Sequence, residues 1–188
     1  TNRRPLDTRR TRGGKPPRNA AQVELTISHV GGRGDGVGRA PYKHNHITDE
    51  HSVFVPATLA GEQVVATPVA ISGQGIRAVL HEIITPSPER REPDCAAFPA
   101  CGGCSFQHWR DESVTAWKQD LVTGFLARAG VPCPEITPPH VARRHARRRA
   151  TFRLKRLAGG VAAGFLERAS DRIITPQDCS ILDPALIT

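Results

Sequence analysis

Four cysteines constrain the fold of this chain more than any other feature of its sequence. Three lie close together in DCAAFPACGGCSFQHW, with the spacing C-x5-C-x2-C, and a fourth follows far downstream in TPQDCSIL. If their thiolates share one inorganic centre, that centre closes a long loop and couples metal binding to the folding of the enclosed region. The candidate ligands are Cys95, Cys101, Cys104 and Cys179.

Both zinc and a [4Fe-4S] cluster accept four cysteines. Structural zinc more often uses two short pairs, so three neighbouring ligands and a remote one favour the cluster. The glycines of Cys101-Gly102-Gly103-Cys104 would let backbone N–H groups approach the sulfurs. Four protein thiolates leave no iron open to substrate, which predicts a structural or regulatory centre. Cys133, between two prolines and without an adjacent base, is interpreted as an incidental thiol.

The cellular setting follows from what the sequence lacks. No run approaches the roughly 20 apolar residues that span a bilayer, and the first thirty residues have no apolar core of a secretion signal. An odd number of cysteines, five, argues against a disulfide framework. We therefore expect a soluble, cytoplasmic protein.

Positive charge is concentrated in two places. Residues 1–18 carry seven Arg and Lys with one acid, and residues 143–156, the basic segment, carry eight with none. Because the net charge of the chain is +8, the remainder is acidic. Clustered bases on an acidic body are typical of proteins that bind a polyanion by releasing its counterions. The candidate RNA contacts are Arg143, Arg144, Arg147, Arg148, Arg149, Arg153 and Lys155.

The amino-terminal half predicts a tail followed by a barrel. Residues 1–19 mix Arg, Pro and Gly without hydrophobic periodicity, which predicts a disordered basic tail. From Val23 apolar and polar residues alternate, and further strand-like runs cover 52–56, 63–72 and 76–87. A glycine-rich stretch at 31–40 predicts a tight turn. Four or five short strands within residues 20–87 indicate a small OB-like β-barrel, a fold that often binds oligonucleotides.

Residues 88–188 predict a small α+β domain. After the cysteines, residues 107–129 show helical spacing with a broad apolar stripe, and Gly130 and Pro132 should end that helix. In a chain of this size the stripe has few obvious partners, so we expect it to dock on a missing domain or on another copy. Residues 146–179 alternate again, with Phe152 and Leu154 opposite a basic face, which predicts a small sheet.

The motifs together resemble a known family. ISHVGGRGDGVGRA followed by SVFVPATLAGEQVVA resembles a TRAM domain, a small RNA-binding β-barrel. CAAFPACGGCSFQH, HARRRATFRL, AAGFLERAS and ITPQDCSIL are similar to the iron-sulfur RNA uracil-5-methyltransferases. The resemblance runs from about residue 21 to the end. It implies a [4Fe-4S] cluster on the four cysteines and structured RNA as partner, ribosomal RNA ahead of tRNA.

The resemblance also implies a part that this sequence does not contain. Family members continue into a Rossmann-like domain that binds S-adenosylmethionine and supplies a cysteine nucleophile and an acidic base, and no such motif occurs here. We therefore expect the amino-terminal portion of a methyltransferase, without catalytic residues. Two alternatives stay open. One is a free-standing zinc-binding RNA adaptor, and the other is a radical-SAM enzyme, whose C-x3-C-x2-C triad differs from the spacing here.

Overall fold

The computed structural model describes residues 21–44, 47–72 and 75–187, and the predicted tail at 1–19 lies outside them. The chain divides into two compact units, Thr1–Ser87 and Pro88–Thr188. The prediction of a mainly β chain with a barrel and a helix is confirmed. No helix among the described residues is long and apolar enough to cross a membrane.

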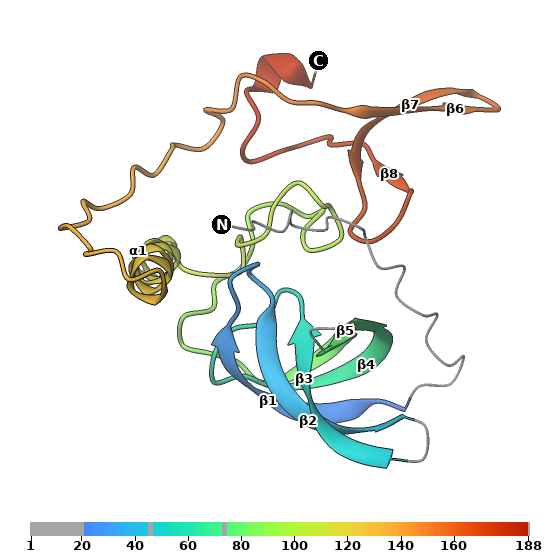
Figure 1. The fold of residues 1–188 in the computed structure, drawn as a ribbon. Helices are drawn as coiled ribbons and strands as arrows, with labels where there is room; N and C mark the ends of the chain where they lie inside the picture. The colour runs from blue at the N-terminus through green and yellow to red at the C-terminus, as the bar shows by residue number, and fades with distance from the viewer. Residues whose placement is uncertain (1–20, 45–46, 73–74, 188) are drawn as a thin grey trace, which may run out of the picture. The chain divides into compact units, whose positions relative to one another are not determined.

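The first unit is a closed five-stranded barrel, consistent with an OB-like fold (Figure 1). The strands close in the order β1-β2-β3-β5-β4, with β1 against β4. Neighbours run antiparallel except β3 and β5, which are parallel. The strands are β1 (Val23–Val30), β2 (Gly36–His44), β3 (Ile47–Val55), β4 (Gln63–Ser72) and β5 (Gly75–Thr85).

The alternation that predicted β1 also accounts for the barrel core. Leu25 and Ile27 are buried, whereas the polar residues beside them are exposed. Side chains on successive strand positions point to opposite faces, so each strand contributes every second residue to the interior. The core comprises Leu25, Ile27, Ala40, Val53, Val55, Val64, Ala66, Ile76 and Ala78.

The glycine-rich stretch is only partly the turn that we predicted. A turn forms at 31–35, where the Gly34 N–H donates to the Gly31 carbonyl oxygen at 2.8 Å. Gly36 and Gly38 instead lie in β2. A Cβ at Gly38 would stand 2.6 Å from the Thr26 carbonyl oxygen, so the glycine permits a close approach of β1 and β2.

The second unit contains helix α1 (Asp111–Arg128) and a three-stranded sheet. The helix begins four residues later than predicted, because residues 107–110 pair with the preceding segment: Arg91 N–H donates to the His108 carbonyl and Arg110 N–H to the Glu89 carbonyl. Gly130, with φ of 68°, follows its end as predicted. None of its residues is buried, and Phe125 is 56 % exposed. Docking of this helix stays a prediction.

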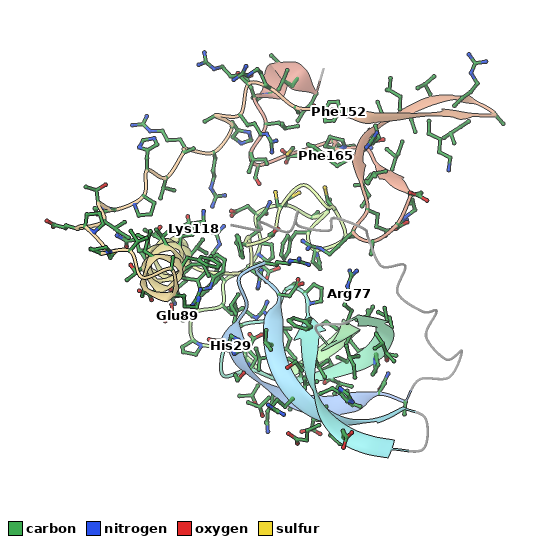
Figure 2. All side chains as sticks on the ribbon, in the orientation of Figure 1. His29, Arg77, Glu89, Lys118, Phe152 and Phe165 are labelled. Atoms are coloured by element: carbon green, nitrogen blue, oxygen red, sulfur yellow. The ribbon has the colours of Figure 1, made fainter. Side chains whose placement is uncertain are left out.

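The sheet of the second unit is shorter than the predicted alternation from residue 146. Its strands are β6 (Arg153–Leu157), β7 (Gly160–Leu166) and β8 (Ile173–Ile174), and a short 3-10 helix η1 (Pro184–Leu186) follows. Phe152 packs edge-on against Phe165 with ring centroids 5.2 Å apart (Figure 2). Leu154, which was predicted to share a face with Phe152, is 72 % exposed. Val161 on β7 is also 66 % exposed, so the described residues leave these two apolar side chains of the β6–β7 hairpin uncovered.

Candidate metal centre

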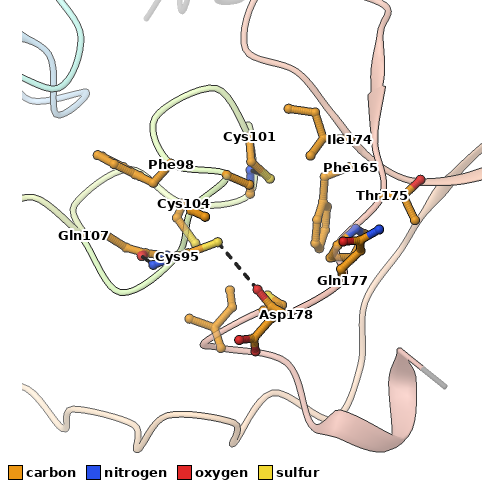
Figure 3. Close-up of a pocket in the computed structure, with 16 residues that line it drawn as sticks. Cys95, Phe98, Cys101, Cys104, Gln107, Phe165, Ile174, Thr175, Gln177 and Asp178 are labelled. Carbon is orange, nitrogen blue, oxygen red and sulfur yellow. Dashed lines mark hydrogen bonds between the residues drawn. The ribbon is translucent and has the colours of Figure 1, made fainter. Parts of the chain in front are cut away.

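The four candidate cysteines line one cavity of about 260 Å³. Three belong to residues 95–104, the cysteine loop, and Cys179 comes from the segment after β8. In Figure 3 the labelled Cys95, Cys101 and Cys104 lie across the cavity from Phe165 and Asp178. Cys179 is buried, and the other three are half-buried. The fold therefore brings the remote cysteine to the same cavity as its predicted partners, although metal binding by them stays a prediction.

The cavity is mostly apolar apart from its sulfurs. Phe98, Phe165, Ile174, Pro176 and Ile181 contribute to its wall. Within the described residues, no three His, Cys, Asp or Glu side chains form a ready-made site for a metal ion. Four thiols that line one cavity are a donor set that suits either a zinc ion or a [4Fe-4S] cluster.

Polar groups around the sulfurs are few and well placed. The Gly103 N–H donates to Cys101 Sγ at 3.4 Å, as the adjacent glycines led us to expect. The Cys95 N–H donates to Gln107 Oε1 at 3.1 Å, and the Cys95 thiol approaches the Asp178 carbonyl oxygen at 3.9 Å (Figure 3). A backbone N–H directed at a sulfur, as that of Gly103 is, lowers the negative charge on a ligating thiolate, whereas the Asp178 carbonyl oxygen is an acceptor and has no such effect.

Ionisation of the Cys104 thiol is opposed by its surroundings. Burial raises the pKa of Cys104, and the charges of Cys179, Cys101 and Cys95 raise it further, against a hydrogen bond with Gln107 that lowers it. Four thiolates in one apolar cavity repel one another, whereas a cationic centre among them would favour the ionised form. The donor set therefore fits a bound metal centre whose loading releases protons.

The cysteine loop is joined to the sheet by backbone hydrogen bonds. The Gly102 N–H donates to the Leu166 carbonyl oxygen at 2.9 Å, and the Arg168 N–H donates to the Ala100 carbonyl oxygen at 2.8 Å. Between them, Cys101 pairs with Glu167 in an antiparallel bridge. The Arg168 side chain adds a hydrogen bond from Nη2 to the Cys104 carbonyl oxygen at 2.9 Å. This junction fixes the three near cysteines against β7.

The basic segment is held by the residues that follow Cys179. The Arg147 N–H donates to the Ile181 carbonyl oxygen at 3.0 Å, and the Asp183 N–H donates to the Arg147 carbonyl oxygen at 3.0 Å. The His145 N–H likewise donates to the Ser180 carbonyl oxygen at 3.1 Å. Ordering the chain at Cys179 therefore also orders the backbone that carries the arginines.

A second connection lies at Asp94, the residue before Cys95. Its carboxylate forms ion pairs with Arg91 and Arg144. Partial burial raises the pKa of Asp94, but the hydrogen bonds and charges of Arg144 and Arg91 outweigh this effect and hold the pKa below its ordinary value. Arg144 thus ties the basic segment to the start of the cysteine loop.

All seven candidate RNA contacts have exposed side chains. Arg144 is engaged by Asp94, and Arg147 Nε donates to the Arg149 carbonyl oxygen at 3.2 Å. Across the part of the chain that the structure describes, five have no side-chain hydrogen bond or ion pair: Arg143, Arg148, Arg149, Arg153 and Lys155. These guanidinium and ammonium groups are available to phosphates.

Several residues of the site were not predicted from the sequence. Gln107 contacts both Cys95 and Cys104, and its position three residues after the last near cysteine was the only available signal. Phe98 and Phe165 line the cavity, and Phe98 also stacks on the buried His108 ring with centroids 5.3 Å apart. Nothing in the local sequence pointed to Arg168, because its contact with the cysteine loop exists only once β7 lies beside that loop.

Comparison with known proteins gives the site a context. The chain is 36 % identical over 164 residues to an uncharacterized RNA methyltransferase of Brucella suis, a match that covers 87 % of this chain and 36 % of that protein. It is 37 % identical over 166 residues to one of Caulobacter vibrioides, covering 87 % and 37 %, and 29 % identical over 169 residues to one of Thermosynechococcus vestitus, covering 88 % and 36 %.

These similarities support a relationship with RNA methyltransferases. The chain spans little more than a third of the length of these relatives. No family model matches the sequence. The matched residues cover most of the chain, so they include residues of both compact units.

Proposed function

We propose that this chain is the RNA-recognition and [4Fe-4S]-bearing portion of an S-adenosylmethionine-dependent RNA (uracil-5-)-methyltransferase, with structured ribosomal RNA as the expected substrate. One observation carries the proposal: the cavity lined by four cysteines and the basic segment share a backbone connection through residues 180–183. Similarity to proteins named RNA methyltransferases supports the RNA and methyltransferase parts of the proposal.

In this proposal Cys95, Cys101, Cys104 and Cys179 hold the cluster. With four protein thiolates the cluster supplies cross-linking rather than an open coordination position. Residues 104–179 include α1 and the basic segment, so the cross-link reduces the freedom of the region that must meet RNA. Methyl transfer belongs to another part of the parent enzyme, since this sequence shows neither a methyl-donor motif nor a nucleophile motif.

RNA binding would rest mainly on phosphates. The exposed guanidinium groups of the basic segment release counterions when they meet the backbone, which makes affinity fall with salt. Structured RNA suits such a surface, because double-stranded RNA is recognised largely through phosphates and shape. The barrel supplies a second surface of the kind that often binds oligonucleotides.

The test is the salt dependence of affinity for a ribosomal RNA fragment, measured by fluorescence anisotropy. Replacing Arg147, Arg148 and Arg149 together by Gln should weaken binding and reduce the slope of log affinity against log salt by about one per lost phosphate contact. A loss of two positive charges on α1, Lys118→Gln with Arg128→Gln, should leave the slope near its wild-type value, so a change in the three-arginine variant is not a general effect of net charge. An unchanged slope in the arginine variant would remove the basic segment from the interface.

A further inference from the structure

A second cavity lies beside the same cysteine loop and is not part of the thiol site. It measures about 400 Å³ and is lined by residues that include Gly102, Thr151, Arg153 and Arg168. The cysteine cavity shares Phe165 with it but none of these four residues. The cavity therefore has side chains from two segments in its wall. Thr151 and Arg153 come from the start of β6 and the residues before it, and Arg168 follows β7.

The donors at this cavity are incompletely used. Among the described residues, neither the Thr151 hydroxyl nor the Arg153 guanidinium takes part in a hydrogen bond or ion pair. Arg168 uses Nη2 on the Cys104 carbonyl, while its Nε is enclosed and has no hydrogen-bond partner. The Arg168 side chain is therefore held at the cavity wall by a neutral carbonyl group and not by a carboxylate.

The charge of the cavity is positive despite one carboxylate in its wall. Glu167 also lines it, but that carboxylate is already paired with Arg172 through a hydrogen bond from Nε to Oε2 of 2.9 Å. Arg153 and Arg168 remain without a carboxylate partner within the described ranges. Guanidinium groups bind phosphate oxygens in a bidentate geometry, and a nearby hydroxyl adds a third donor.

We propose that this cavity is a binding site for a single phosphate of the RNA backbone. The inference rests on the proposed RNA-binding function and deepens it, because it picks out one phosphate position from the general cationic surface. Arg153 and Thr151 contact the phosphate, and Arg168 is held for it by the cysteine loop. The RNA backbone would thus be fixed directly beside the cysteine loop.

The experiment compares two arginines of one strand in the full-length chain. Arg153 lines the cavity and Arg156, three residues along β6, does not, yet both are exposed. Arg153→Gln should reduce affinity for the ribosomal RNA fragment roughly tenfold. Arg156→Gln removes one charge of the basic segment outside the cavity, so it should reduce affinity only by the smaller factor of a single solvent-screened phosphate contact. Tryptophan fluorescence of both variants checks that the second unit is folded.

Inorganic phosphate separates an RNA phosphate from a free anion. Added phosphate should displace RNA from the wild-type chain more strongly than chloride at equal ionic strength, and Arg153→Gln should abolish that difference. Equal losses of affinity in the two variants, or no specific effect of phosphate, would refute the proposed phosphate site. Neither result would contradict RNA binding by the chain. If the wild-type chain binds inorganic phosphate through Arg153 but binds no RNA, the proposed function is refuted. The proposal that this site binds a phosphate of RNA is then refuted as well.

Discussion

Replacing Gly102 with alanine should loosen the junction between the cysteine loop and the sheet. An added Cβ would stand 2.7 Å from the Leu166 carbonyl oxygen, the same atom that accepts the Gly102 N–H at 2.9 Å. Such a distance cannot be tolerated without a backbone shift, and the shift lengthens the hydrogen bond. A lost backbone hydrogen bond costs about 1 kcal/mol, and strain at a packed junction adds a similar amount. We therefore expect Gly102→Ala to lower the free energy of unfolding of the second unit by about 2 kcal/mol.

The assay is denaturant unfolding followed by tryptophan fluorescence. Both tryptophans of the chain, Trp109 and Trp117, lie in the second unit and pack against Phe106, so their signal reports on that unit alone. A loss of this size should also lower the thermal midpoint by roughly 10 °C for a unit of about 100 residues.

Gly159 provides the matched control. A Cβ at this position in the β6–β7 turn would meet nothing within 4 Å, so Gly159→Ala should change stability by less than about 0.5 kcal/mol. Equal stability of the Gly102 variant and wild type would refute the close approach of the loop to Leu166. It would also mean that the Cys101-Gly102-Gly103-Cys104 turn does not need a glycine at position 102.

Three further predictions concern other parts of the molecule. Leu182 is fully buried and pairs with Arg147, so Leu182→Ala should lower the free energy of unfolding by roughly 3 kcal/mol, measured by tryptophan fluorescence. The variant should also bind RNA more weakly, and wild-type affinity would contradict the coupling between this segment and the basic segment. Glu62→Leu, which removes a buried carboxylate that accepts two backbone N–H groups, should destabilise the barrel by about 2–4 kcal/mol, visible as faster hydrogen exchange there and not in the second unit. A hydrogen bond with Arg172 lowers the pKa of Glu167, so the stability from this pair is complete above the ordinary carboxyl pKa and is lost as pH falls through the lowered value. Arg172→Gln should return that pKa toward its ordinary range in an NMR titration, and an unmoved pKa would exclude the pair.

The fold was predictable where one periodicity repeats. Alternation of Val23, Leu25 and Ile27 predicted a strand with its apolar groups on one face; the barrel buries Leu25 and Ile27, and Val23 is half-buried. Alternation also predicted that Leu154 lies in a strand opposite the basic side chains, and Leu154 does lie in β6. Its exposure could not be predicted, because a strand pattern does not say whether any element covers the apolar face. The segment before β6 was predicted to be a strand, but within the described residues it forms an isolated bridge between Arg147 and Leu182, a long-range contact that the local sequence does not encode.

The candidate site divides in a similar way. Cysteine spacing singled out the four thiols that line one cavity, because cysteine is rare and its chemistry is specific. Gln107 and Arg168 contact the loop through common polar groups, and nothing in their local sequence distinguishes them from surface residues. Clustered charge indicated a polyanion-binding surface, whereas the cavity shared by Thr151, Arg153 and Arg168 required the folded arrangement of β6 and β7.

Iron and sulfide content of the anaerobically purified chain tests the central claim most directly, together with Mössbauer spectroscopy and RNA affinity. We predict a [4Fe-4S] signature with about four irons per chain. Cys179→Ser should lose that signature and weaken RNA binding, whereas Cys133→Ser, at an exposed cysteine away from the cavity, should keep both. A wild-type chain that contains zinc or no metal under these conditions would contradict the account, as would a Cys179→Ser variant with full iron content.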